Sequence, residues 1–333
     1  MNNTAIQAVP TNIITGFLGV GKTSAILHLL KSKPDNERWA VLVNEFGEIG
    51  VDGSLFEGQH TENNGVFIRE VPGGCMCCAA GLPMQIALNQ LLSQAKPDRL
   101  LIEPTGLGHP KEVLQILSAD YYQEILSLQK TLTLVDARKL SDPQYTNHDT
   151  FNQQITIADT IIGNKVDLYD EYDKFQLSSY IKQHAKPDTE IILTQQGQFD
   201  LSVLSGPTSW KLETAHHHHH HAKKDKVMAS DAPIPESGFL KAQNEGEGFK
   251  SAGWRFSPDK VFDHNKLLGI LTGIQTERLK AVFITESGVF GYNLTNDGMT
   301  EFELDDCAES RIEIIATELS ETLEDNLLAC LVE

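Results

Sequence analysis

The feature that most constrains this chain is a glycine-rich segment near its beginning. Residues 16–23 read Gly-Phe-Leu-Gly-Val-Gly-Lys-Thr and fit the phosphate-binding pattern G-x-x-x-x-G-K-[ST]. Apolar residues over 9–15 predict a buried strand before it, and the apolar spacing over 24–31 predicts a helix after it. This order lets backbone N–H groups and the positive end of the helix face an anion. The alternative, a plain glycine turn before an ordinary helix, leaves the Lys-Thr pair unexplained.

The residue types in this segment suggest separate roles in binding a nucleotide. Lys22 is expected to reach the β- and γ-phosphates, and the hydroxyl of Thr23 is expected to ligate Mg²⁺. Glycines let the backbone approach an anion without a Cβ in the way. The backbone positions expected around the phosphates are Gly16, Gly19, Val20 and Gly21.

Acidic residues follow two of the predicted strands. A strand over 40–43 leads into an acidic, glycine-rich stretch over 44–53, which contains Glu48 and Asp52 and is either a switch region or a plain polar loop. A second apolar strand over 99–103 ends in Glu103 and is followed by Gly106. Asp52 and Glu103 are candidates for the magnesium shell or for orienting water, so they join Lys22 as the candidate catalytic residues.

A second nucleotide signal lies downstream, after a predicted strand over 160–163. Residues Asn164, Lys165 and Asp167 form the pattern N-K-x-D, in which the aspartate accepts hydrogen bonds from the guanine N1–H and exocyclic amine. Adenine offers neither donor on that edge, so the pattern favours GTP over ATP. Strands and helices alternate throughout, which predicts an α/β domain over 1–205 with a mostly parallel, doubly wound sheet.

Composition changes after this domain. Residues 206–251 are polar and rich in Gly, Pro and Lys, and they predict a flexible linker. Residues 252–333 predict a smaller α+β domain with an antiparallel sheet. The linker carries six consecutive histidines, which are either a native loop that binds zinc exchangeably or a purification tag. They are His216, His217, His218, His219, His220 and His221.

A cysteine cluster is the second strong chemical signal. Three of the five cysteines lie within four residues, at Cys75, Cys77 and Cys78. Thiolates favour Zn²⁺ and other soft ions, and one short turn does not readily fill a tetrahedral site. An outside ligand is therefore expected, and Glu48 is the candidate. The alternative is a set of buried structural cysteines.

Charge and hydropathy exclude some classes of function. A net charge of −19 argues against nonspecific nucleic-acid binding. Residues 301–333 contain eleven Asp or Glu and one Arg, which indicates either a solvated acidic surface or a docking site for a basic partner. The start of the chain lacks a signal sequence, and no apolar run approaches the ~20 residues of a membrane span, so we expect a cytoplasmic protein with no membrane partner.

Taken in order, the motifs resemble a known family. Gly-Phe-Leu-Gly-Val-Gly-Lys-Thr, Asn-Glu-Phe-Gly-Glu, Gly-Gly-Cys-Met-Cys-Cys, Glu-Pro-Thr-Gly and Asn-Lys-Val-Asp resemble the CobW-like metallochaperone GTPases, also described as zinc-regulated GTPase metalloprotein activators. These are related to the nickel-insertion GTPases for urease and hydrogenase. The resemblance implies Mg²⁺-dependent conversion of GTP to GDP, coupled to zinc binding at the C-x-C-C turn with Glu48. It also implies delivery to a client metalloprotein, and a homo-oligomer is possible.

Three other functions stay open at this level. The chain is alternatively a zinc storage protein whose nucleotide site is mainly structural. A cobalt-directed chaperone of the same family is a second alternative, because Co²⁺ also accepts tetrahedral thiolate sites. A P-loop kinase for a small molecule is the third.

Overall fold

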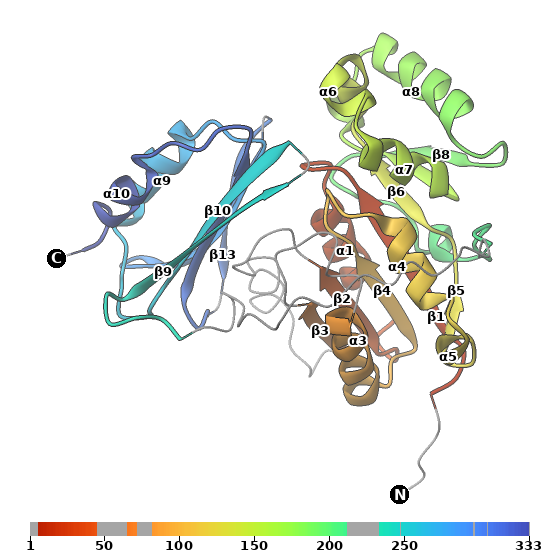
Figure 1. Cartoon of the computed structure of the whole chain (residues 1–333), viewed down its shortest axis with the longest axis horizontal. Helices are drawn as coiled ribbons and strands as arrows, with labels where there is room; N and C mark the ends of the chain where they lie inside the picture. Colours follow the sequence, from red (N-terminus) through yellow and green to blue (C-terminus); the bar gives the residue numbers. More distant parts are fainter. Residues whose placement is uncertain are drawn as a thin grey trace, which may run out of the picture.

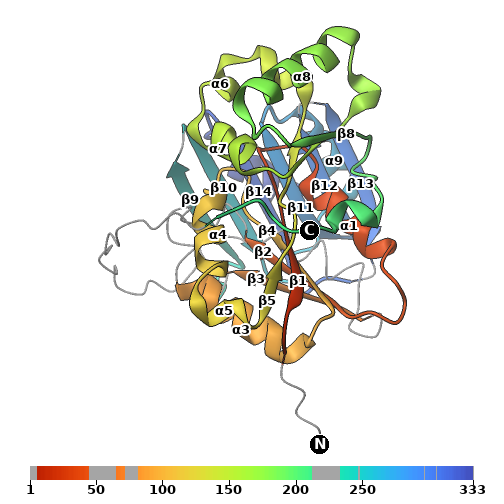
Figure 2. The ribbon, with the colours of Figure 1, turned by 90° about the vertical axis from the view of Figure 1, so that its right-hand side faces the viewer.

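Two β-sheets organise the chain. The computed structural model describes residues 6–44, 65–71, 82–211, 233–246, 248–295, 297–304 and 306–332. One sheet and its helices are built from the first two thirds of the sequence, and the other sheet comes from the last third (Figure 1). Figure 2 shows the first domain in front of the second sheet, so one domain covers the other in that view.

The first sheet is parallel in every pairing. It has eight strands in the order β3-β2-β4-β1-β6-β7-β8, with β5 also paired to β1. The strands are β1 (Val9–Gly16), β2 (Trp39–Asn44), β3 (Val66–Val71), β4 (Arg99–Glu103), β5 (Leu126–Leu128), β6 (Leu132–Val135), β7 (Thr160–Gly163) and β8 (Glu190–Leu193). Because all pairs are parallel, the carboxyl ends of β1, β4, β7 and β8 lie at one edge.

Both faces of this sheet are covered. Successive residues of β1, Ile13 and Ile14, belong to different buried clusters, as alternation along a strand requires. Helix α1 packs into the cluster of Ile14, and α3 packs into the cluster of Ile13. The helices are α1 (Lys22–Lys31), α3 (Leu82–Ala95), α4 (Pro110–Leu117), α5 (Asp120–Gln123), α6 (Pro143–Thr146), α7 (Asp149–Ile157) and α8 (Glu171–His184), with short 3₁₀ turns η2 (Ala137–Ser141), η3 (Val166–Leu168) and η4 (Leu201–Leu204).

The second sheet is antiparallel and has six strands in the order β13-β12-β11-β14-β10-β9. Two helices cover the face that is turned away from the first domain (Figure 1). Trp254 and Phe283 of the sheet form a buried cluster there with Leu267 and Leu327 of the helices. The elements are β9 (Phe239–Gly246), β10 (Phe249–Phe256), α9 (His264–Gly273), β11 (Arg278–Thr285), β12 (Gly288–Thr295), β13 (Gly298–Leu304), β14 (Ser310–Ala316) and α10 (Leu323–Leu328).

The structure confirms the predicted fold class, an α/β domain with a mostly parallel sheet and a smaller α+β domain. The linker prediction is wrong for residues 239–246 and 249–251, which are strand. β9 is an edge strand, and its alternate residues Lys241, Gln243 and Glu245 are exposed, which explains its polar composition. Eight residue pairs with β10 hold it in the sheet.

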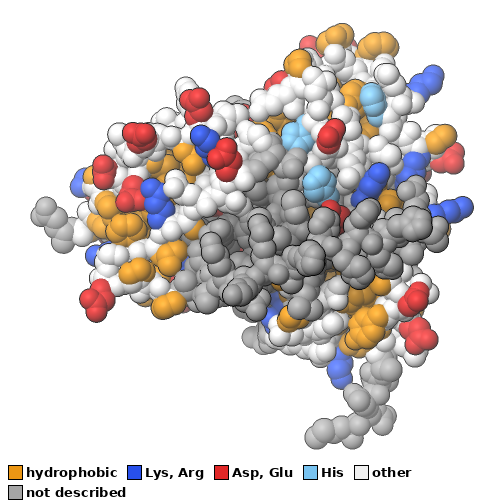
Figure 3. All heavy atoms as spheres, viewed as in Figure 1, with side chains coloured by type: hydrophobic (Ala, Val, Ile, Leu, Met, Phe, Trp, Pro, Cys, Tyr) orange, Lys and Arg blue, Asp and Glu red, His pale blue; other side chains and the backbone are white. Residues whose placement is uncertain are grey.

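The surface gives two further observations. Within the described ranges, none of the helices combines the length and the apolar character needed to cross a bilayer. On the face drawn in Figure 3, acidic side chains of the second domain lie singly among basic, apolar and neutral ones. On that face the acid is dispersed, as in an ordinary solvated surface.

Candidate functional site

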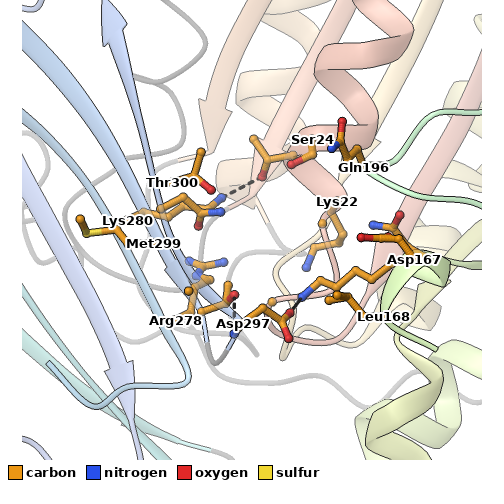
Figure 4. A pocket seen from close by; sticks show the side chains of 18 of the residues that line it. Lys22, Ser24, Asp167, Leu168, Gln196, Arg278, Lys280, Asp297, Met299 and Thr300 are labelled. Carbon is orange, nitrogen blue, oxygen red and sulfur yellow. Dashed lines mark hydrogen bonds and ion pairs between the residues drawn. The ribbon is translucent and has the colours of Figure 1, made fainter. Parts of the chain in front are cut away.

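The carboxyl edge of the first sheet forms one wall of a cavity of about 360 Å³. The opposite wall comes from β11, β12, β13 and the turn between the last two, all of the second domain (Figure 4). The sequence-predicted residues that line the cavity are Gly19, Gly21, Lys22, Thr23, Glu103, Asn164, Lys165 and Asp167. The fold therefore brings the phosphate-loop and guanine-recognition motifs to the same place, although 140 residues separate them.

The backbone of the phosphate loop requires its glycines. Gly16, Gly19 and Gly21 have φ of 146°, 69° and 94°, which side chains rarely tolerate. A Cβ on Gly16 would lie 2.5 Å from the backbone oxygen of Leu134, and one on Gly21 would lie 2.6 Å from Nδ2 of Asn164. The loop conformation thus follows from the residue types that the motif specifies.

Lys22 is the first residue of α1 and is almost fully enclosed, with 5% of its surface exposed. Its Nζ donates to the backbone oxygens of Gly16 at 2.9 Å and Phe17 at 3.1 Å, which are carbonyls of the loop itself. The ammonium group is therefore held beneath the loop at the floor of the cavity. Gly106 leaves room for it, because a Cβ there would lie 3.2 Å from this Nζ.

The electrostatic setting of Lys22 is unusual. Burial lowers the pKa of this lysine to about 7, since an enclosed ammonium loses its hydration. Glu103 opposes that change, while the nearby cations Arg278 and Lys280 lower the pKa further. An anion in the cavity would offset these costs and favour the charged form.

The side chains of Thr23 and Glu103 bring two oxygen atoms together that could ligate a metal ion. The hydroxyl of Thr23 donates to Oε1 of Glu103 at 3.2 Å, and Glu103 is buried at the end of β4. A hydroxyl and a carboxylate beside a phosphate loop are the donors that Mg²⁺ takes, so these residues fit that ion. A cation already lies here, because Nζ of Lys280 donates to the Thr23 hydroxyl at 2.8 Å.

Asn164 is buried and uses its amide on the protein backbone. Its Nδ2 donates to the backbone oxygen of Val20 at 2.8 Å, and its Oδ1 accepts from the N–H of Gly197 at 2.9 Å. The side chain thus ties the phosphate loop to the loop after β8. In this structure Asn164 positions two loops, while it also lines the cavity.

Lys165 and Asp167 present their side chains differently. Lys165 has a left-handed backbone with φ of 67°, and its Nζ forms an ion pair with Asp297 of the second domain. Asp297 also pairs with Arg138 at 2.6 Å. Asp167 is exposed and lines the cavity, so its carboxylate is accessible to a ligand.

Several cavity residues were not predicted from the sequence. Gln196 follows β8, and its position after a strand was the available signal. Arg278 and Lys280 of β11 and Asp297 of the β12–β13 turn come from the second domain. The alternation of these two cations with apolar residues in a strand indicates a charged face, but it does not indicate what that face contacts.

The predicted zinc ligands lie outside the described residues. These are Cys75, Cys77, Cys78 and Glu48, and the same holds for Asp52 and for the histidines at 216–221. In the part of the chain that the structure describes, no group of three or more His, Cys, Asp or Glu is placed to hold a metal. Cys307 and Cys330 of the second domain are free thiols, the first partly buried and the second buried.

The sequence and the fold of this chain were compared with those of known proteins. The family described as CobW/HypB/UreG, nucleotide-binding domain, matches residues 10–192. The chain is 41% identical over 314 residues to a protein named zinc chaperone YeiR from Escherichia coli K12, covering 92% of this chain and 93% of that protein. It is 28% identical to a protein named zinc chaperone CobW from Pseudomonas aeruginosa, covering 60% of each. The solved structure of Zn(II)-bound YjiA GTPase from E. coli aligns over 97% of this chain and 99% of that one, with 19% identity and a TM-score of 0.46.

Proposed function

Because the chain belongs to the CobW/HypB/UreG family, we propose that it hydrolyses GTP and uses the nucleotide cycle to deliver zinc to a client metalloprotein. The observation that carries this proposal is the cavity in which the phosphate loop, a partly buried Thr-Glu oxygen pair and the N-K-x-D residues converge. Convergence of these groups matches what a guanine nucleotide with Mg²⁺ requires.

Each residue has a role under this proposal. Loop N–H groups and Lys22 bind the β- and γ-phosphates, and the exposed carboxylate of Asp167 accepts from guanine. Thr23 and Glu103 hold Mg²⁺, which when bound neutralises charge on the phosphates. Glu103 is alternatively the residue that orients the attacking water, and Asp52 is a second candidate for that task.

The zinc part rests on the relatives and on chain topology. Relatives named zinc chaperones make zinc the first ion to test, with cobalt as the alternative. The acidic stretch leaves the sheet after β2, and the Cys75, Cys77 and Cys78 stretch leaves it after β3. These strands are neighbours, and their last residues Asn44 and Val71 are partners in register. A ligand set of Glu48 with the three cysteines therefore joins segments that start at adjacent points on the nucleotide edge.

The deciding experiment measures GTP hydrolysis against free zinc concentration. We expect zinc to raise the rate in the wild type, and we expect Cys77→Ala to lose that response while still binding GTP. Cys307→Ala is the matched control, since it removes a cysteine of the second domain. A flat response in the wild type would contradict coupling and favour zinc storage or another cognate metal.

Zinc binding in a nucleotide-site variant separates the two activities. Lys22→Ala is expected to abolish GTP turnover and to retain substantial zinc binding, because the sites use different residues. Loss of both in a folded variant would contradict two sites. Several zinc ions bound per chain together with zinc-independent hydrolysis would identify a buffer, and phosphate release without an added acceptor would exclude a small-molecule kinase.

A further inference from the structure

Strand β11 of the second domain directs two cations into the nucleotide cavity. Arg278 and Lys280 are two residues apart, so they lie on the same face of the strand. The residues that alternate with them, Leu279 and Ala281, are fully buried in the core under α9 and α10. The two cations therefore occupy the face toward the first domain, where both line the cavity (Figure 4).

These cations are enclosed rather than solvated. Arg278 is 6% exposed and Lys280 is 5% exposed. Lys280 donates to the hydroxyl of Thr23 at 2.8 Å, and Nη2 of Arg278 lies 3.6 Å from Oε2 of the buried Glu313. Long cationic side chains rarely become this buried without a strong electrostatic reason.

The charges at this point suit an anionic ligand. Three cationic side chains line the cavity, namely Lys22, Arg278 and Lys280. The positive charges of Arg278 and Lys280 lower the pKa of Lys22. Glu103 and Glu313 offset part of the repulsion among these cations, and a polyphosphate would add further attraction. Arginine and lysine are also the side chains that recognise phosphate, the former through two parallel donors.

The position of β11 is held on both sides of these cations. Glu277, which precedes Arg278, accepts from the hydroxyl of Tyr145 at 3.2 Å. Asp297, in the turn after β12, pairs with Arg138 and Lys165 of the first domain. These contacts fix the strand against the edge where the phosphate loop lies.

We propose that Arg278 and Lys280 bind the polyphosphate of the nucleotide, so that the C-terminal sheet completes the GTP site within the same chain. This inference rests on the proposed function, since it adds ligands for the same nucleotide. Lys280 exchanges the Thr23 hydroxyl for a phosphate oxygen when the nucleotide binds. Arg278 spans two phosphate oxygens and stabilises charge that builds up during hydrolysis.

The test uses the full-length chain, with Arg278→Gln and Lys280→Gln, which remove charge but keep a long polar side chain. Lys266→Ala is the control, since Lys266 lies on α9 with its side chain 60% exposed. Equilibrium binding of a fluorescent GTP analogue and phosphate release from GTP are both measured. Each Gln variant is expected to bind at least about tenfold more weakly, because it loses a charge-assisted hydrogen bond. Turnover is expected to fall further for Arg278→Gln, and Lys280→Arg is expected to recover part of the binding.

The outcomes distinguish this inference from the proposed function. If the wild type neither binds nor hydrolyses GTP, the proposed function itself fails. If the wild type does both and the Gln variants match Lys266→Ala, the inference alone is wrong. Tighter binding by the Gln variants would show that β11 competes with the nucleotide, and it would also overturn the inference. Circular dichroism and thermal unfolding verify the fold. Arg278→Lys replaces Arg278→Gln, and Lys280→Arg replaces Lys280→Gln, if either Gln variant does not fold.

Discussion

At the scale of single residues, the protonation of Lys22 depends on whether an anionic ligand is bound. Its pKa in the free protein is lowered to about 7 by burial, partly offset by Glu103. A bound polyphosphate stabilises the charged form and raises that pKa. At a pH between the pKa of Lys22 in the free protein and its pKa in the complex, Lys22 therefore takes up a proton when GTP binds. It follows that the contribution of Lys22 to GTP affinity is constant below about pH 7 and falls as the pH rises above it.

Proton uptake by Lys22 gives the first prediction. At pH 8 the terminal phosphate is already ionised, so the lysine is the group expected to change its protonation. Calorimetric titration with GTP in two buffers of different ionisation heat should show an uptake approaching one proton. Lys22→Met, which does not titrate, should show none. Equal heats in both buffers for the wild type would contradict the low pKa.

Asn164 gives a second residue-scale prediction. Asn164→Ala leaves the backbone groups of Val20 and Gly197 without their partner, which costs about 1–3 kcal/mol of unfolding free energy. GTP affinity should also fall, because the phosphate loop and the loop after β8 lose their connection.

The control is Asn152→Ala, which removes another amide with two hydrogen bonds, one to the oxygen of Thr146 and one from Tyr180. It lies on α7 and does not line the cavity. Chemical denaturation should give both variants a similar loss of stability, while fluorescence titration should show weaker GTP binding for Asn164→Ala alone. Unchanged GTP binding in that variant would show that the connection is purely structural.

At the scale of elements, the β12–β13 turn docks the second sheet through Asp297. Burial alone would raise the pKa of this carboxyl, but hydrogen bonds from Arg138 and Lys165 lower it to about 2. A lowered pKa means that the ion pair stabilises docking above the ordinary pKa of 3.8 and loses this effect as the pH falls toward 2. Asp297 therefore stays ionised between pH 5 and 8, and its contribution to docking of the second sheet on the first domain should be constant over that range.

Asp297→Asn tests this contact. The substitution removes the charge, and we expect a loss of about 1 kcal/mol, since the pair is partly exposed and screened by solvent. Hydrogen–deuterium exchange should become faster in β12 and β13 at neutral pH. Glu318→Gln, the same charge change at an exposed residue of the same domain, should leave the exchange unchanged. Identical exchange in both variants would show that the turn does not hold the sheet in place.

Elements also show what could be predicted from the sequence. Strands β4 and β7 and helix α1 lie where the sequence predicts them, because runs and spacings of apolar residues mark them. β9 could not be predicted, since an edge strand that pairs on one side looks like a polar linker. The phosphate loop and N-K-x-D are local patterns and were found, whereas Arg278 and Lys280 reach the site through domain packing that no local pattern encodes.

At the scale of the whole molecule, the two domains share part of one hydrophobic core. Phe17, within the phosphate loop, packs its ring against Tyr145, His148 and Phe151 at centroid distances of 5.1, 4.8 and 5.9 Å. Phe249 at the start of β10 joins this cluster, 6.3 Å from Phe17. Domain docking is thus connected directly to the loop that would bind phosphate.

Phe249→Ala should weaken docking of the second domain on the first, because it removes the ring that packs near Phe17. Phe249 is buried, and its truncation is expected to cost about 3–5 kcal/mol. Phe262→Ala is the matched control, because Phe262 is equally buried but packs against Phe256 and Phe283 inside the second domain. Both variants should unfold at lower temperature in scanning calorimetry, and Phe249→Ala should also unfold in two resolved transitions.

GTP binding distinguishes these two variants. If the second sheet completes the nucleotide site, loss of docking in Phe249→Ala must weaken GTP binding, while Phe262→Ala at a temperature where it is folded must bind as the wild type does. GTP should also stabilise the second domain of the wild type and fail to stabilise it in Phe249→Ala, because a ligand raises the stability only of the parts it contacts or couples to. Equal GTP affinity in the two variants would mean that the first domain binds nucleotide alone and that the shared core serves stability.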